Sequence, residues 1–314
     1  MKKVLTLISA VLAFSLLTGC TTSPAETYSS ADEQILVTDD LGRELAVTMP
    51  KRTAVLIGSF ADVWCLAGGK DSLVAAADDT WTQFDLDLSE DVVHLGGVKT
   101  PSLEKLLAAQ PDLVIGSTKT SADLELQATL EKMGIPVLYF NVSTFEDYLR
   151  MLKICTELTG HPEHYTTYGT DIQAQVDAAI DRVSGEQPSV LYVRASGSSC
   201  KIKNSKDSVL GEMLADLGCR NIADNEESLL ESLSMETILA QDPDYIFAVL
   251  QGSDTEKAQK SLQEALLNNP ARNSLSAVRE GRFYIMDQKL YNLKPNARWG
   301  EAYENLADIL YPEK

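Results

Sequence analysis

The sequence predicts an α/β protein with two Rossmann-like lobes, each built on a mainly parallel sheet, joined by a single long α-helix. Three observations support this fold class: apolar runs alternate with helical patterns, one long helical pattern lies mid-chain, and a helix-to-strand phrase occurs twice. Alternating strands and helices with short links are typical of βαβ units and parallel sheets. A chain of 314 residues is also longer than one ordinary core requires, which favours two lobes.

The first 33 residues predict an export signal and a tether rather than folded structure. Lys2 and Lys3 precede an apolar stretch over residues 4–17, and Leu-Thr-Gly-Cys closes the segment at Cys20. This pattern is typical of a cleaved signal peptide, here residues 1–19. The apolar stretch is shorter than the about 20 residues that a membrane-spanning helix needs. The Thr/Ser-rich residues 20–33 are expected to form a flexible tether.

The first lobe is expected over residues 34–160. It opens with a hairpin whose turn lies at Asp40 to Gly42, and Gly68, Pro111, Gly134 and Gly160 mark the ends of successive helices. The predicted strands cover residues 54–57, 73–77, 113–115 and 137–140, and the predicted helices cover 60–67, 103–109, 122–133 and 145–159.

The linking helix is expected over residues 161–184. Pro162 opens a helical pattern that runs to Val183, about 22 residues or about 33 Å, which suits a rigid connection between lobes. The second lobe is expected over residues 185–314. Its predicted strands cover residues 190–193, 245–249 and 283–286, and its predicted helices cover 209–217, 235–240, 258–267 and 296–310.

A phrase in the first lobe recurs in the second. Ser102-Leu-Glu-Lys-Leu-Leu-Ala-Ala-Gln-Pro-Asp-Leu-Val-Ile aligns without gaps on Ser234-Met-Glu-Thr-Ile-Leu-Ala-Gln-Asp-Pro-Asp-Tyr-Ile-Phe. In both copies a serine is placed to cap a helix that ends at Pro-Asp, directly before a buried strand. Glu104 and Glu236 fall in the first turn of each helix, where they either complement the helix dipole or meet a partner.

Composition and charge narrow the function. Hydrophobic residues make up 44% and charged residues 23%, which fits a packed globular body. The 27 basic and 46 acidic residues give a net charge of −19, so nucleic acid is not expected as a partner. An anionic ligand would have to meet a local basic patch.

Cysteines, histidines and sequence motifs give little support to catalysis or metal binding. Cys65 and Cys155 lie within apolar helical patterns and are expected to be buried as small hydrophobic residues, whereas a bridge between Cys200 and Cys219 stays open. His161 and His164 are spaced i, i+3 without an evident third ligand, so a solvated helix start is favoured and no metal site is expected.

No Gly-x-Ser-x-Gly, P-loop or Gly-x-Gly-x-x-Gly motif occurs, so we expect no enzyme. The alternative from another class is a surface-anchored redox protein that uses Cys200 and Cys219.

The chain resembles the substrate-binding lipoproteins of ABC importers for iron–siderophore, haem and cobalamin. The resemblance is carried by the Leu-Thr-Gly-Cys ending, the Asp40-Leu-Gly-Arg-Glu hairpin, the two lobes around one helix and the Ser-Leu-Glu to Pro-Asp phrase. It implies acylation of Cys20 and a monomer anchored by lipid to the extracytoplasmic face of the cell membrane. It also implies that Glu104 and Glu236 meet arginines of a permease dimer, and that the ligand lies between the lobes without a covalent cofactor.

The ligand is predicted from the strand ends that would face the cleft. Residues 194–206 contain four cations and no acid, which favours an anionic ferric–siderophore complex. Residues 78–91 contain six acids and no base, so this loop would repel an anion unless its carboxylates point outward. Aromatic stacking would instead suit haem or cobalamin, although Trp64 and Trp299 are expected in the core. The candidate ligand-binding residues are Trp81, Lys119, Arg194, Lys201, Lys203 and Tyr291.

Overall fold

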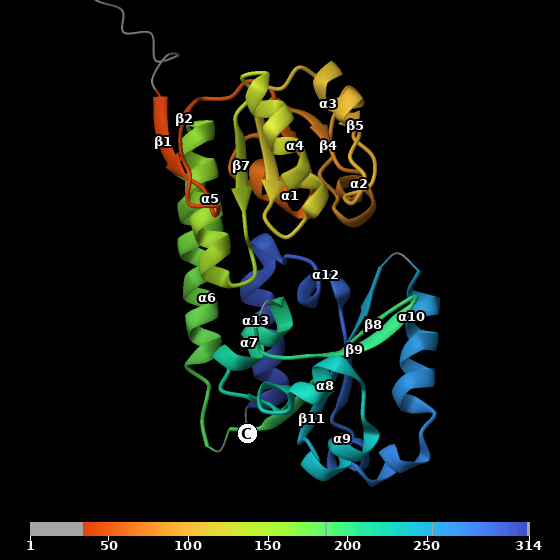
Figure 1. Ribbon diagram of the computed structural model, residues 1–314. Helices are drawn as coiled ribbons and strands as arrows, with labels where there is room; N and C mark the ends of the chain where they lie inside the picture. The colour runs from red at the N-terminus through yellow and green to blue at the C-terminus, as the bar shows by residue number, and fades with distance from the viewer. Residues whose placement is uncertain (1–33, 186, 207, 253, 313–314) are drawn as a thin grey trace, which may run out of the picture.

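The computed structural model describes residues 34–185, 187–206, 208–252 and 254–312, arranged as two lobes one above the other (Figure 1). The predicted signal peptide, the tether and Cys20 lie outside these residues. No helix of the described ranges is long and apolar enough to cross a membrane.

The predicted hairpin forms from β1 (Gln34–Thr38) and β2 (Glu44–Thr48), which pair antiparallel. The Asp39 carboxylate closes its turn by accepting hydrogen bonds from the backbone N–H groups of Leu41 and Arg43, both at 3.0 Å. The Asp40 N–H donates to the carbonyl of Tyr139 at 2.9 Å, which attaches the hairpin to the first lobe.

The first lobe is a parallel five-stranded sheet in the order β5-β4-β3-β6-β7 with helices on both faces. Its strands are β3 (Thr53–Val55), β4 (Leu73–Ala76), β5 (Val93–His94), β6 (Leu113–Ser117) and β7 (Val137–Phe140). Its helices are α1 (Gly58–Leu66), α2 (Asp79–Gln83), α3 (Leu103–Ala108), α4 (Ser121–Lys132) and α5 (Phe145–Thr159). The short elements β5 and α2 were not predicted.

The connection between the lobes differs from the single α-helix that the sequence predicts. Residues 164–180 are helical, but a π-helix over Thr166–Thr170 precedes α6 (Asp171–Ile180). The Tyr148 hydroxyl donates to the carbonyl of Tyr168 at 2.7 Å and so competes with the regular helical bonds of this turn. The helix closes at Ile180 with i to i−3 bonds from Arg182 and Val183, so it is about 25 Å long. The proposed lobe boundaries at residues 160 and 185 stay predictions.

The second lobe holds parallel strands in the order β10-β8-β11-β12, with β9 antiparallel to β8. Its strands are β8 (Ser189–Ser196), β9 (Ser199–Lys203), β10 (Arg220–Asn221), β11 (Tyr245–Gln251) and β12 (Phe283–Met286). Its α-helices are α7 (Val209–Asp216), α8 (Glu227–Glu231), α9 (Met235–Gln241), α10 (Thr255–Leu262), α11 (Ser276–Arg279), α12 (Gln288–Tyr291) and α13 (Trp299–Leu310). Of these, α13 packs against α6 and so ties the lobe to the linking helix.

The repeated phrase forms the same structure in both lobes, as predicted. Ser102 and Ser234 cap α3 and α9, each hydroxyl accepting a backbone hydrogen bond at 3.3 Å. The aspartate after each proline then holds the start of the neighbouring strand: Asp112 accepts from the N–H of Arg52 at 3.0 Å, and Asp244 accepts from that of Ser189 at 2.8 Å. The two lobes therefore share one αβ unit and the same hydrogen bond from its aspartate to the neighbouring strand.

The cysteines do not form the pair that the redox alternative requires. Cys200 and Cys219 are free thiols that pack in hydrophobic clusters on opposite faces of the second sheet. Burial raises the pKa of Cys200 to about 11 and that of Cys219 to about 12, so both stay protonated at neutral pH. Cys155 is fully buried and Cys65 half-buried, in line with the prediction for these two.

Candidate functional site: the cleft between the lobes

Residues that follow the strands of both lobes meet in the cleft between them. Asn296, beyond β12, donates its side-chain amide to the carbonyl of Ser59 and to the carboxylate of Asp62, both at 2.8 Å. Beside this contact lies a cavity of about 310 Å³. Its walls are Asp62, Gln83, Phe84, Asp85 and Leu86 of the first lobe and Lys289, Lys294, Pro295, Ala297 and Arg298 of the second.

A smaller cavity of about 50 Å³ lies deeper between the lobes, where Arg194 and Lys294 both reach its wall. The other lining residues are Ser143, Tyr192, Ser208, Val209, Tyr291 and Asn292. Within the described residues, the Ser208 hydroxyl and the Asn292 side-chain oxygen are buried without a hydrogen-bond partner. Leaving such groups unpaired costs about 1–3 kcal/mol each, so this cavity favours a polar guest.

Two cations from distant parts of the chain, Arg194 and Lys294, line this cavity, and the charge of Lys119 also acts on Lys294. The pKa of Lys294 is lowered to about 8, chiefly because burial disfavours its charge and because Arg194 lies close by. Asp147 opposes this shift, and Lys119 of the first lobe adds to it. Like charges that are buried close together repel one another and raise the free energy of the empty site. A bound anion between them would remove this repulsion.

The predicted basic residues of the second lobe share one face of the β8–β9 hairpin. Arg194 stands directly opposite Lys201, and Tyr192 stands opposite Lys203, so their side chains point to the same side. Arg194 and Lys203 are half-buried, whereas Lys201 is exposed. The structure thus brings Arg194 into the cavity wall, whereas Lys201 and Lys203 are not among the residues that line it.

Lys119 lies beyond β6 and borders a hollow of about 220 Å³ together with Lys99. Neither Lys99 nor Lys294 was among the predicted site residues. A single lysine after a strand, such as Lys294, carries no sequence signal of its own. The acid-free run at 194–206 was the only clear signal of positive charge.

The predicted aromatic residues are less available than expected. Trp81 stacks on His94 with ring centroids 3.6 Å apart, so one face of the indole is already covered. Tyr291 is 2% exposed and its hydroxyl donates to the carbonyl of Ala302, so it forms cavity wall rather than a free hydrogen-bonding group. Trp64 and Trp299 are fully buried in the core, as predicted.

The acidic loop at residues 78–91 directs several of its carboxylates away from the cations. Asp79 accepts from the N–H of Gly58 at 2.9 Å, and Asp78 lies 3.2 Å from the His94 ring nitrogen. The Asp87 side chain is 100% exposed. Asp85 does line the larger cavity, so that part of the cleft carries both signs of charge.

Glu104 and Glu236 are exposed in the first turns of α3 and α9. In Figure 1, α3 lies near the far end of the upper lobe and α9 near the far end of the lower lobe. Both side chains are exposed, and neither lines the cavities of the cleft.

Two parallel-sheet lobes around a polar cleft define a two-lobed binding protein rather than a single-domain module. Residues 54–290 match the family described as periplasmic binding protein, and the chain belongs to this family. The Bacillus subtilis protein YhfQ, provisionally named an ABC transporter substrate-binding lipoprotein, is 23% identical over 309 residues, covering 94% of this chain and 93% of YhfQ.

Two solved structures show the same fold. Staphylococcus aureus SirA complexed with staphyloferrin B matches with a TM-score of 0.66 and 20% identity, covering 88% of this chain and 97% of SirA. A periplasmic haem-binding protein from Pseudomonas aeruginosa matches with a TM-score of 0.68 and 23% identity, covering 84% of this chain and 94% of its own.

Proposed function

We propose that the chain is the substrate-binding lipoprotein of an ABC importer and that it captures an anionic ferric–siderophore complex. The meeting of Arg194 and Lys294 at the small cavity carries this proposal, and the charge of Lys119 acts on Lys294 from the first lobe. In a chain of net charge −19, such a cluster is a specific feature rather than a consequence of overall composition.

The chemistry of the cluster suits the oxygens of an iron chelate. Arginine offers a planar fork of donors that matches carboxylate oxygens, and lysine adds a compact point charge. Hydrogen bonds between ionised partners are shorter and about twice as strong as neutral ones, and sheltering from water strengthens them further. These groups bind and orient a complex, and none of them is arranged for covalent chemistry.

The relatives support this ligand class while leaving an alternative. SirA was solved with staphyloferrin B, whereas the Pseudomonas aeruginosa relative is a haem-binding protein and others are vitamin B12-binding proteins. Stacking on a flat macrocycle has less support, because His94 covers one face of Trp81 and Tyr291 is buried. The geometry therefore favours the charged chelate over haem or cobalamin.

Delivery of the ligand to the permease would depend on the lipid anchor and on one exposed glutamate in each lobe. In this proposal acylated Cys20 holds the chain at the extracytoplasmic face of the membrane, and the lobes stand on a tether of residues 20–33. Glu104 and Glu236, one on each lobe, meet arginines of the permease when the loaded protein docks. Their exposure supports this role.

A fluorescence-quenching titration of the purified chain tests the ligand class. Ferric catecholates, ferric citrate-type complexes, ferric hydroxamates, haem and cobalamin are compared under one set of conditions. Tight saturable binding of an anionic ferric complex is expected. Preference for cobalamin or haem would assign the cleft to the alternative, and binding of none would remove the proposal.

A further inference from the structure

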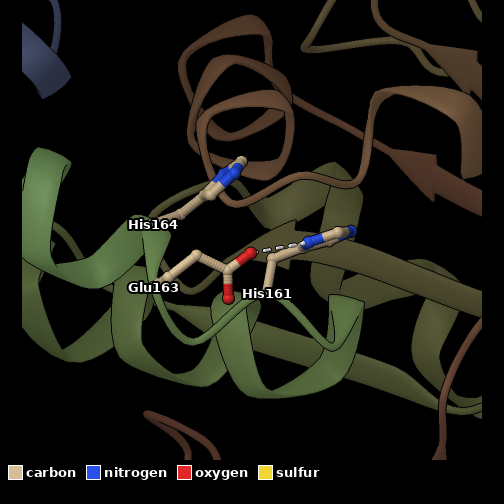
Figure 2. A group of neighbouring side chains, drawn as sticks. All are labelled: His161, Glu163 and His164. Atoms are coloured by element: carbon tan, nitrogen blue, oxygen red, sulfur yellow. Dashed lines mark hydrogen bonds and ion pairs between the residues drawn. The ribbon is translucent and has the colours of Figure 1, made fainter.

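We propose a second binding site, for a divalent transition-metal ion, formed by His161, Glu163 and His164 at the end of the first lobe remote from the cleft (Figure 2). Each of the three side chains offers one ligand atom, and these atoms lie within 4.8 Å of one another.

The spacing is close to what a metal requires. The His161 Nδ1 and the Glu163 Oε1 are 3.1 Å apart, and the two imidazole rings are stacked with centroids 5.2 Å apart. Tetrahedral zinc with bonds of about 2.0–2.1 Å holds its ligand atoms about 3.3 Å apart. One pair already has this spacing, and the ligand atom of the third residue lies within 4.8 Å of both. The His161 and Glu163 side chains are 47% and 65% exposed, so an ion has access and the Glu163 carboxylate has room to adjust.

The His164 ring is oriented as metal-binding histidines usually are. Its Nδ1 lies 2.8 Å from the carbonyl oxygen of Leu66, at the end of α1. A carbonyl only accepts, so Nδ1 carries the proton and the lone pair of the neutral ring is at Nε2. A backbone carbonyl on the far nitrogen commonly fixes the tautomer of histidines that bind metals.

The His161 ring is positioned by a close approach to Gly68. A Cβ atom at residue 68 would come within 2.5 Å of the His161 Cδ2, and the backbone φ of +92° also favours glycine there. The two histidines are thus both fixed against the end of α1, one by a hydrogen bond and one by packing.

The sequence pattern does not indicate Glu163 as a third ligand, because residues 161–164 were expected to be helical. In a helix, residues two apart do not face each other, which would set Glu163 aside. The structure instead places residues 161–163 in the turn between α5 and the linking helix, which begins at residue 164. The turn brings the Glu163 carboxylate beside the His161 ring, as Figure 2 shows.

This site is separate from the cleft. The α1 helix begins beside the cleft, where Asn296 contacts Ser59, and ends at Leu66 beside the cluster, about 13 Å further on. Two imidazoles and one carboxylate favour zinc, nickel or copper over magnesium or calcium, which prefer all-oxygen sites. The carboxylate also offsets the positive end of the linking helix, which would otherwise oppose a cation.

Isothermal titration of the full chain with ZnCl₂ tests the site, with protein purified in detergent and first stripped with a chelator. We expect one zinc per chain. His161→Ala and Glu163→Gln should each weaken binding by about tenfold or more, because even outer partners of a ligand contribute about 10- to 100-fold. Both residues are exposed, so these variants should fold. His94→Ala removes the remaining histidine and is the matched control, with unchanged zinc affinity.

Several outcomes would overturn the assignment. Wild-type protein that binds no zinc, variants that bind as tightly as wild type, or a His94→Ala variant that loses binding would each do so. Competition by magnesium or calcium at similar concentrations would contradict the ligand chemistry. Affinity for the ferric complex should be the same in His161→Ala and wild type, because the cluster lies away from the cleft.

Discussion

Arg194 is the single side chain whose loss should weaken ligand binding most. We expect Arg194→Ala to reduce the affinity for an anionic ferric complex by about 1.5–3 kcal/mol, the range for a hydrogen bond to a charged group. Fluorescence titration of the purified chain measures this. Lys206→Ala is the control, since Lys206 is exposed beyond β9 and outside the lining of the small cavity. Unchanged affinity in Arg194→Ala, together with lost binding in Trp81→Ala, would point to stacking on a macrocycle.

Lys294 should make ligand binding depend on pH. Its pKa of about 8 means that it loses its charge above this pH, whereas a bound anion holds the proton and raises the pKa. Affinity should therefore fall by up to about tenfold per pH unit above pH 8, for a complex whose own charge is constant. Lys294→Arg keeps its charge throughout and should bind with little pH dependence. Identical pH profiles for the two proteins would exclude Lys294 from the site.

Asp123 should make the stability of the first lobe depend on pH. Burial raises its pKa to about 7, although its carboxylate accepts from the N–H of Ser117 at 2.8 Å. Between about pH 4 and 7 the folded chain holds a proton that the unfolded chain has lost, so stability falls as pH rises, by at most about 1.4 kcal/mol per unit. Asp123→Asn cannot titrate, so its melting temperature should fall less over this interval. Parallel melting curves would refute the shift.

Single residues of the site could be predicted only where the sequence itself was unusual. Arg194 was found because thirteen residues without an acid stand out in an acidic chain. Lys294 has ordinary surroundings in sequence, and only the packing of the folded chain brings it beside Arg194. Tyr291 was expected to contact ligand directly, but its hydroxyl is used within the core.

At the scale of helices, α3 and α9 carry the proposed docking residues. Replacing Glu104 and Glu236 together with Ala should leave melting temperature and ligand affinity nearly unchanged, because exposed carboxylates contribute little to stability. Uptake into cells should nevertheless fall, since each desolvated pair with a permease arginine is worth about 2 kcal/mol or more. Normal uptake would mean that both glutamates only interact with the dipoles of their helices. Loss of ligand affinity would mean that they take part in ligand binding at the cleft.

The helices and strands themselves were largely predictable, and the exceptions have physical reasons. The repeated phrase predicted α3, α9 and the strands after them, because capping serine, apolar spacing and Pro-Asp all agree. The strand β9 was missed because only two of its five residues, Cys200 and Ile202, are apolar, although both pack in the core beside β8. The π-helix depends on Tyr148, which contacts Tyr168 only in the folded chain.

At the scale of the whole molecule, closure around the ligand should be small. A helix over residues 164–180 joins the lobes, α13 packs along α6, and Asn296 already bonds across the cleft. Rigid connections of this kind restrict hinge movement, which needs a few residues free to change their backbone angles. Small-angle scattering with and without the ferric complex should give nearly the same radius of gyration. A marked compaction on binding would contradict this account.

The two-lobed architecture could be predicted because the alternation of strands and helices, and the chain length, are properties of long stretches of sequence. The cleft could not, because it joins residues about a hundred positions apart, such as Arg194 and Lys294. The alternation indicates that strand ends meet but not which side chains point inward. The ligand class therefore depends on the folded arrangement more than on any one motif.

Locating the iron tests the central claim most directly. Crystals grown with an anionic ferric–siderophore complex and measured at the iron absorption edge would show the metal as an anomalous peak. The account predicts one peak between the lobes, with chelate oxygens at about 2.7–3.2 Å from the side-chain nitrogens of Arg194 and Lys294. A peak away from these residues, or a complex in which neither contacts the chelate, would contradict it.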